Sequence, residues 1–222
     1  MSLETLKTKV GLLIEKAQSG GGEDFVGVKW LEVDASGYPT KVIIPANLLQ
    51  THTLFYMKSS NYGAWQNLKE LDYNHCTAHI GEMIAQNCSK LQTIKNIENI
   101  THILNNAFNS TSLTSITFGE QLRSIGAYAF RYTKLTNVTF PPSVTAINET
   151  AFGNITTLTK VIFKGTPTTL HQYAFINCTN LTDIYVPWAE GVVANAPWSA
   201  TKATIHYNTT FDENGNPIAT EV

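Results

Sequence analysis

The residues best suited to chemistry lie in one short segment, where two histidines flank a cysteine. His75, Cys76 and His79 occur within five positions, and Cys88 follows further along the chain. Imidazole nitrogens and thiolates are common zinc ligands, so this group is a candidate metal site. The repeat described below favours a simpler interpretation, with His79 stacked in a loop and Cys88 pointing elsewhere. We therefore expect no metal and no other cofactor.

A second polar segment resembles part of a calcium-binding loop. Asp212, Asn214, Gly215 and Asn216 carry suitable oxygen ligands and a glycine for a sharp bend. The segment lacks the later bidentate glutamate and the length that such a loop requires. Asn-Gly and Asn-Pro pairs are also ordinary turn residues. We expect a turn here.

No set of residues predicts catalysis. The serines lack the G-x-S-x-G context of a nucleophile elbow, and no phosphate-binding loop of the G-x-x-x-x-G-K form occurs. The carboxylates of Glu149 and Asp183 lie on a regular repeat, with no acidic partner expected opposite them. The sequence thus predicts a protein that is not an enzyme.

The elements that position these residues come from an internal repeat. The dipeptide Ala-Phe recurs as Ala107-Phe108, Ala129-Phe130, Ala151-Phe152 and Ala174-Phe175, in steps of 22, 22 and 23 residues. Self-similarity at this period is typical of a solenoid, in which each coil stacks on its neighbours. Weaker copies occur upstream, with Ile84-Ala85 in place of Ala-Phe. We count six coils.

Each coil is expected to contribute one strand to a parallel sheet. After each Ala-Phe comes a segment such as Leu135-x-x-Val138-x-Phe140, whose alternation is that of a strand with one buried face. Parallel strands lie about 4.8 Å apart, so six coils predict a continuous sheet roughly 29 Å long. The Ile-Gly-x-x-Ala-Phe segments are expected to form a short turn or a short helical turn on the opposite side.

The pattern I-G-x-x-A-F-x-x-[CT]-x-x-L-x-x-[IV]-x-[FV]-P resembles the BspA-type leucine-rich repeat. The match covers residues 57–190, and the segment Ile184–Pro187 with Trp198 is similar to the closing element of the family. Departures are the Ile84-Ala85 coil and the irregular stretch 41–67. The resemblance implies a leucine-rich-repeat solenoid of the kind found in bacterial surface and adhesion proteins and in phage-encoded structural proteins.

An N-terminal segment, residues 1–18, predicts an amphipathic helix. Its apolar residues follow the 3-4 spacing of a coiled-coil seam, and they are Leu3, Leu6, Val10, Leu13 and Ala17. Residues 19–24 then form a glycine-rich linker. The helix could simply cap the first coil. We favour self-association as a homotrimer or dimer, because a glycine joint is a poor way to dock a cap.

Both ends of the solenoid are expected to carry β caps. Residues 25–56 contain a hairpin in which 25–33 and 41–44 are the strands, covering an otherwise exposed sheet edge. Residues 191–222 contain a further strand at 203–207 and a turn at 212–217. They form a C-terminal cap or an extending tail.

Composition narrows the partners and the compartment. The formal net charge is −2 and 14% of residues are charged, without a basic cluster, so nucleic-acid binding is not expected. No apolar run approaches the roughly 20 residues of a membrane span, so we expect no membrane insertion. Charged residues interrupt Met1–Lys16, which argues against a secretory signal. The three cysteines are expected to be unpaired, because repeat spacing separates Cys88 and Cys178 by about 19 Å.

The outward side chains of the strands are the remaining candidate for function. They are mainly short, polar and uncharged, and extended solenoid surfaces of this kind bind partners. The predicted face comprises Thr93, Lys95, Ser115, Thr117, Asn137, Thr139, Lys160, Ile162, Asp183 and Tyr185. Such a surface can hydrogen-bond sugar hydroxyls or a protein strand. Alternatively, threonine is present only because it suits exposed strands.

The repeat body, the helix and the linker together suggest a phage virion component, such as a tail-fibre, receptor-binding or capsid-attached protein. We expect it to lie in the virion and to contact itself, other virion proteins, or a host-surface protein or glycan. The alternative is a bacterial cell-surface adhesin or an intracellular protein-interaction module of the same repeat family.

Overall fold

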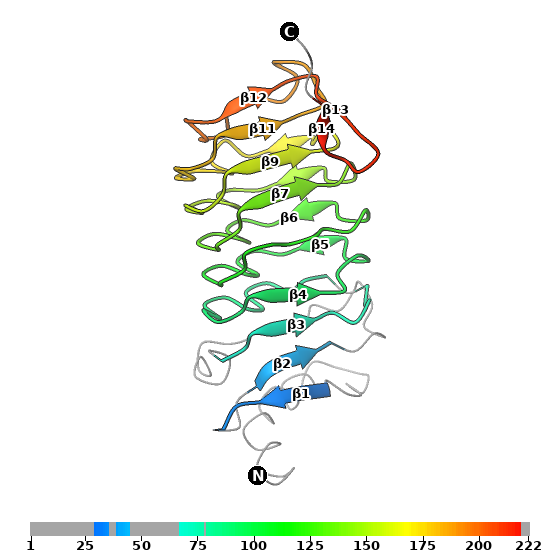
Figure 1. The fold of residues 1–222 in the computed structure, drawn as a ribbon, viewed down its shortest axis with the longest axis vertical. Coiled ribbons are helices and arrows are strands. Elements are labelled where there is room, and N and C mark those ends of the chain that lie inside the picture. Colours follow the sequence, from blue (N-terminus) through cyan, green and yellow to red (C-terminus); the bar gives the residue numbers. More distant parts are fainter. Residues whose placement is uncertain (1–28, 36–38, 45–66, 78, 219–222) are drawn as a thin grey trace.

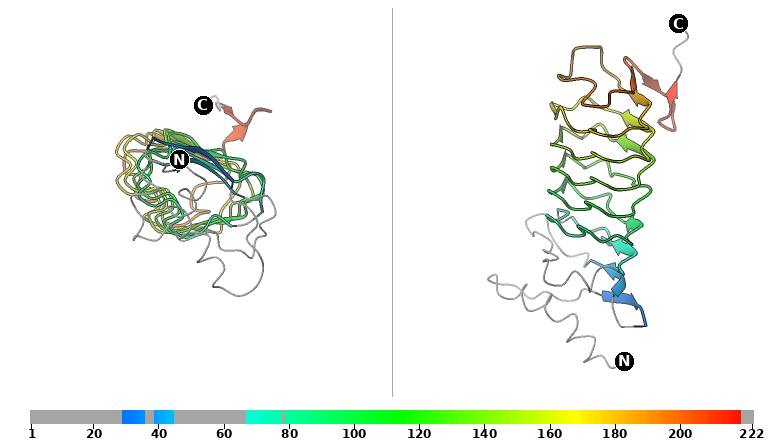
Figure 2. Two further views of the ribbon diagram at one scale, coloured as in Figure 1. Left: turned by 90° about the horizontal axis from the view of Figure 1, so that it is seen from below. Right: turned by 90° about the vertical axis from the view of Figure 1, so that its left-hand side faces the viewer.

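The protein is an elongated stack of coils in the computed structural model, which describes residues 29–35, 39–44, 67–77 and 79–218 (Figure 1). Successive coils lie directly above one another, and seen along the stack they superimpose around a common interior (Figure 2). The predicted helix 1–18 and linker 19–24 lie outside the described residues. The coiled-coil arrangement therefore stays a prediction.

Three four-stranded sheets and one hairpin make up the described secondary structure. The first sheet has the order β1-β2-β3-β4 and consists of β1 (Lys29–Val33), β2 (Pro39–Ile43), β3 (Glu70–Asp72) and β4 (Thr93–Lys95). The second lies across the interior and consists of β5 (His102–Ile103), β6 (Ser124–Ile125), β8 (Ala146–Ile147) and β10 (Thr169–Leu170).

The third sheet continues the face of the first toward the C-terminus. It consists of β7 (Asn137–Phe140), β9 (Lys160–Phe163), β11 (Asp183–Tyr185) and β12 (Thr204–His206). A small antiparallel hairpin follows, formed by β13 (Thr210–Phe211) and β14 (Pro217–Ile218). It stands to the side of the coils in Figure 2.

The N-terminal hairpin joins the solenoid through its second strand. β1 and β2 are antiparallel, and β2 then pairs in parallel with β3, placing Val42 opposite Leu71. Both of these side chains are buried. β2 thus covers the edge of β3, which would otherwise expose unpaired main-chain groups.

Stacked phenylalanines fill the interior in two rows. In the Ala-Phe row, Phe130 lies between Phe108 and Phe152 at ring-centroid distances of 5.4 and 5.1 Å. In the strand row, Phe140 lies between Phe118 and Phe163 at 5.8 and 4.7 Å. Offset aromatic stacks of this spacing stabilise a core beyond the area that they bury. The period of the repeat therefore brings equivalent phenylalanines of successive coils into contact.

Of the two forms expected for the Ala-Phe segments, the described residues show turns and no helix. Their main-chain N–H groups bond to the next coil instead of within their own. Phe130 N donates to Ala151 O at 2.8 Å, and Phe152 N donates to Ala174 O at 2.9 Å. A helix would use these N–H donors for hydrogen bonds within its own turns. Because they bond to the next coil instead, these segments do not form helices.

The outer sheet is not continuous, which corrects the expectation of one sheet through six coils. The segment Thr114–Phe118 should supply the strand between β4 and β7, yet it forms no strand. The sheet therefore divides at this coil into the β1–β4 and β7–β12 parts, while β5 and β6 remain paired on the opposite side.

Candidate functional site

The predicted outward face is largely on the surface, with one exception. Lys95, Ser115, Thr117, Asn137 and Lys160 are exposed, and Thr93, Thr139, Asp183 and Tyr185 are half-buried. Ile162 is only 9% exposed, so placing it among the accessible residues was wrong. It pairs with Thr139 on one side and Tyr185 on the other, and such cross-strand neighbours remove it from solvent.

The C-terminal part of this face carries a compact polar cluster. His206 stacks on Tyr185 with ring centroids 4.3 Å apart, and its Nε2 lies 2.8 Å from Asp183 Oδ1. The hydrogen bond from His206, followed by that from Thr182, holds the pKa of Asp183 below its ordinary value. Sequence reasoning missed His206, although its place two residues beyond Thr204 on a closing strand puts it in register with Tyr185.

The N-terminal part of the face carries an ion-pair bridge. Glu70 lies between Lys41 and Lys95, with N–O distances of 2.6 and 2.8 Å. Burial opposes ionisation of Glu70, but its bonds to the two lysines outweigh that effect and hold its pKa below the ordinary value. Lys41 lies on β2 of the N-terminal hairpin, Glu70 on β3 and Lys95 on β4, so this bridge ties the hairpin to the first coils.

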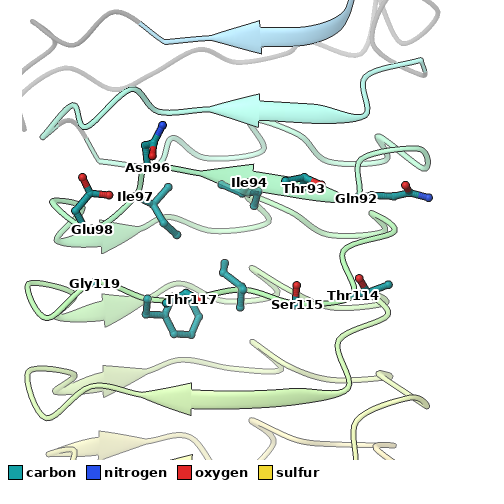
Figure 3. Close-up of a pocket in the computed structure, with 12 residues that line it drawn as sticks. Gln92, Thr93, Ile94, Asn96, Ile97, Glu98, Thr114, Ser115, Thr117 and Gly119 are labelled. Atoms are coloured by element: carbon teal, nitrogen blue, oxygen red, sulfur yellow. The ribbon is translucent and has the colours of Figure 1, made fainter. Parts of the chain in front are cut away.

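Between these parts lies a groove of about 550 Å³, at the coil where the sheet is interrupted (Figure 3). The β4 side provides Gln92, Thr93, Ile94, Asn96, Ile97 and Glu98. The other side provides Thr114, Ser115, Ile116, Thr117, Phe118 and Gly119. Three members of the predicted face line the groove, namely Thr93, Ser115 and Thr117. The groove itself was not predicted.

One departure from the repeat pattern lies at the groove. Asn96 stands 22 residues before Phe118, at the position where later coils have an interior phenylalanine. Its backbone has a left-handed φ of 57°, and its side chain donates to Asp72 Oδ1 at 2.7 Å. The asparagine turns the chain away after Lys95, because it favours both the left-handed conformation and a bond to the preceding coil. Within the described residues, Phe118 therefore stacks on no aromatic ring of the preceding coil at this position.

The interruption uncovers groups that neighbouring coils bury. Ile94 and Ile116 are half-buried, whereas Leu71 and Val138 at equivalent positions are 1% exposed. Among the described residues, Ser115, Ile116, Thr117 and Phe118 take part in no backbone–backbone hydrogen bond. Buried main-chain groups are almost always paired, so an unpaired run on an open surface is available to a ligand.

Contacts at both ends limit how far the groove opens. At one end Ser112 Oγ donates to Ser89 O at 2.7 Å. At the other, a Cβ on Gly119 would lie 2.0 Å from Glu98 O, so the two coils touch through their main chains. The Glu98 carboxylate is hydrogen-bonded to His75 Nδ1. The cleft is therefore a bounded opening between two coils that remain stacked.

The zinc candidates are not brought together. His79 stacks on His102 with ring centroids 4.4 Å apart, as the repeat frame indicated, and Cys76 and Cys88 are buried. Burial raises the pKa of the Cys88 thiol to about 12, so it carries no thiolate at neutral pH. Within the described part of the chain, no group of three or more suitable side chains could hold a metal ion.

The aspartate of the calcium-like segment is engaged in its own turn. Asp212 Oδ1 accepts hydrogen bonds from the main-chain N of Asn214 and Asn216 at 2.9 and 2.7 Å. Its Oδ2 accepts one from Asn216 Nδ2 at 3.1 Å. This is an Asx turn that closes the hairpin between β13 and β14.

All three cysteines of the chain are free thiols.

Parallel coils, a phenylalanine ladder and strands that pair between successive repeats define the class of this protein as a leucine-rich-repeat solenoid. The profile of the BspA type leucine rich repeat region matches residues 56–182 in six copies, so the chain belongs to that family. Proteins of this family are generally repeat scaffolds without enzymatic activity.

A crystal structure of a leucine-rich repeat protein from Bacteroides ovatus is similar to this fold. The two share 25% sequence identity at a TM-score of 0.51, over 74% of this chain. The chain spans about half of that protein, 48% of its length. No curated protein sequence is significantly similar to this one. The residues described here include no helix of the length and apolarity that crossing a bilayer demands.

Proposed function

We propose that this chain is a non-enzymatic binding module that presents the outward face of its strands to a partner. The groove between β4 and Thr114–Gly119 is the centre of that face. One observation carries the proposal: this coil leaves apolar side chains and a run of main-chain groups uncovered, where the coils beyond it bury and pair them. A solenoid with only a structural role has no need of a coil whose outer segment is unpaired.

For the carrier of this module, we propose a phage virion component, such as a tail-fibre, receptor-binding or capsid-attached protein. Support comes from the sequence of residues 1–24, where a heptad-like segment precedes a glycine-rich linker. Such an arrangement suits a homotrimer or dimer whose solenoids reach toward a host-surface protein or glycan, or toward other virion proteins.

A bacterial cell-surface adhesin is the second candidate. The similarity to the Bacteroides ovatus leucine-rich repeat protein favours it, because that relative is encoded by a bacterium and is about one and a half times as long. Quantitative proteomics of a producing culture separates the two carriers. Enrichment of the chain in purified particles supports the virion, and enrichment in the cell-envelope fraction supports the adhesin.

Binding of the fluorescently labelled full chain to intact cells of a Bacteroides panel, measured by flow cytometry, tests the module itself. Thr114→Trp places a large side chain in the groove, and Thr136→Trp makes the same change at the equivalent position one coil later, outside it. We expect saturable binding that Thr114→Trp weakens at least tenfold and Thr136→Trp leaves unchanged. No binding to any strain, or equal binding by both variants, would overturn the proposal.

A further inference from the structure

We infer that the groove takes a neutral carbohydrate, an inference that rests on the binding function proposed above and names its ligand class. The groove has an apolar floor and polar rims. Ile94 and Ile116, which are half-buried, offer hydrocarbon surface, and Thr93, Ser115 and Thr117 offer hydroxyl groups at the edges. Sugars present both kinds of surface, since a pyranose has a C–H face and a ring of hydroxyls.

The charges around the groove favour an uncharged ligand. None of the residues that line it is a lysine, arginine or histidine, so nothing there complements a phosphate, sulfate or uronate. Its one ionisable group is Glu98, whose carboxylate already bonds to His75. The nearby ammonium of Lys95 is not among the lining groups and is held 2.8 Å from Glu70. A carboxylate and hydroxyls suit sugar O–H groups, which both donate and accept.

The main chain adds donors and acceptors at fixed positions. Ser115, Ile116, Thr117 and Phe118 have no backbone partner among the described residues, so their N–H and C=O groups are free to bond to ligand hydroxyls. A site built to hydrogen-bond hydroxyl groups discriminates strongly against analogues that lack them, because its own groups would then be left unpaired.

The geometry disfavours an extended peptide inserted as an extra strand. A strand between two others needs about 9.6 Å between them, twice the ordinary spacing of about 4.8 Å. Here the flanking coils are held together by the Ser112–Ser89 hydrogen bond and by the main-chain contact of Gly119 with Glu98. On the far side, β5 and β6 remain paired in register. The coils therefore cannot separate far enough, whereas a sugar can lie along the open cleft.

The volume agrees with a short oligosaccharide. At about 550 Å³ the groove falls within the usual range for small-ligand sites, roughly 300–1,000 Å³. The cleft is also open to solvent at the sheet surface, so the ends of a longer chain can extend into solvent.

A glycan array carrying both neutral and anionic oligosaccharides, probed with the full chain, tests the inference. We expect binding to one or more neutral glycans and none to sulfated, phosphorylated or uronate glycans. Titration calorimetry with the best neutral ligand should show at least a tenfold loss of affinity in Thr114→Trp and no loss in Thr136→Trp. Binding of no glycan, of anionic glycans only, or of the two variants equally would overturn it.

The cell-binding experiment distinguishes failure of this inference from failure of the proposed function. Cells are treated with periodate, which cleaves vicinal diols of sugars, or with a protease. Loss of binding after periodate alone supports a glycan. Binding that Thr114→Trp weakens but that only protease abolishes keeps the groove as a binding site and replaces its ligand by a protein. Absence of cell binding together with an empty array removes both proposals.

Discussion

Two regions of the solenoid come from the same repeat yet differ in how their strands pair. One is the set of coils from β7 to β12; the other is the junction between β4 and Thr114–Phe118, called the open step below. In the C-terminal coils the strands pair without a gap, and Phe140 and Phe163 continue the interior row. At the open step Asn96 stands in place of the phenylalanine, Thr114–Phe118 forms no strand, and Ile94 and Ile116 are only half-buried. A solenoid can therefore carry an open groove at one coil without any inserted loop.

The largest expected contrast comes from the same truncation at two equivalent positions. Ile184→Ala removes a fully buried side chain in the closed coils and should lower the free energy of unfolding by about 2–5 kcal/mol. Ile116→Ala should cost clearly less, because its side chain is already partly in water and the void opens onto the groove. Urea denaturation of both variants checks this. Equal losses would mean that the step is as closed as the other coils.

The glycine at the end of the groove provides the next test. A Cβ at position 119 would approach Glu98 O to 2.0 Å, so Gly119→Ala must push two coils apart. We expect a loss of about 1–3 kcal/mol in urea denaturation, the usual cost of overpacking. Unchanged stability would show that the coils do not meet there, and the groove would lose its closed end.

Substitution of Asn96 separates its conformation from its hydrogen bond. Asn96→Ala loses the bond to Asp72 and places alanine, which tolerates the left-handed region less well than asparagine, at a φ of 57°. We expect a combined cost of about 2 kcal/mol. Asn96→Gly loses only the bond and should cost roughly half as much, measured by urea denaturation. If the two variants are equally stable, the left-handed turn is not what ends β4.

Most of the fold follows from the spacing of Ala, Phe and Leu, because each coil repeats the same burial pattern. The open step does not follow from spacing, since Leu91 and Ile94 keep the register and conceal the change at Asn96. An asparagine at an interior aromatic position is the signal that would reveal it. The second ladder of β5, β6, β8 and β10 was also missed, because its strands of two residues are too short to show alternation.

Acid should affect the two regions at different pH values, which is the smallest expected effect. Burial, and then the charge of His102, lowers the pKa of His79; burial, and then Arg123, lowers that of His102. The unfolded chain therefore binds protons more readily. Stability is complete above pH about 6.5 and falls as pH drops below that value.

In the C-terminal coils the corresponding group is a carboxylate. The lowered pKa of Asp183 contributes stability above pH about 4, and this contribution is lost only as pH falls further toward the folded pKa. Unfolding followed between pH 7 and 3 should thus show the N-terminal coils weakening first. His102→Gln should flatten the upper part of the profile and leave the lower part intact. A single transition below pH 4 that is insensitive to His102→Gln would contradict this.

Amide hydrogen exchange on the full chain measures the open step most directly. β9 pairs on both sides, so the amides of Lys160–Phe163 should be protected, whereas those of Ser115–Phe118 should exchange at least about tenfold faster. Addition of the neutral glycan that binds should slow exchange at Ser115–Phe118 and leave β9 unchanged. Equal protection of the two segments in the free protein would show a continuous sheet, and the binding site proposed here would not exist.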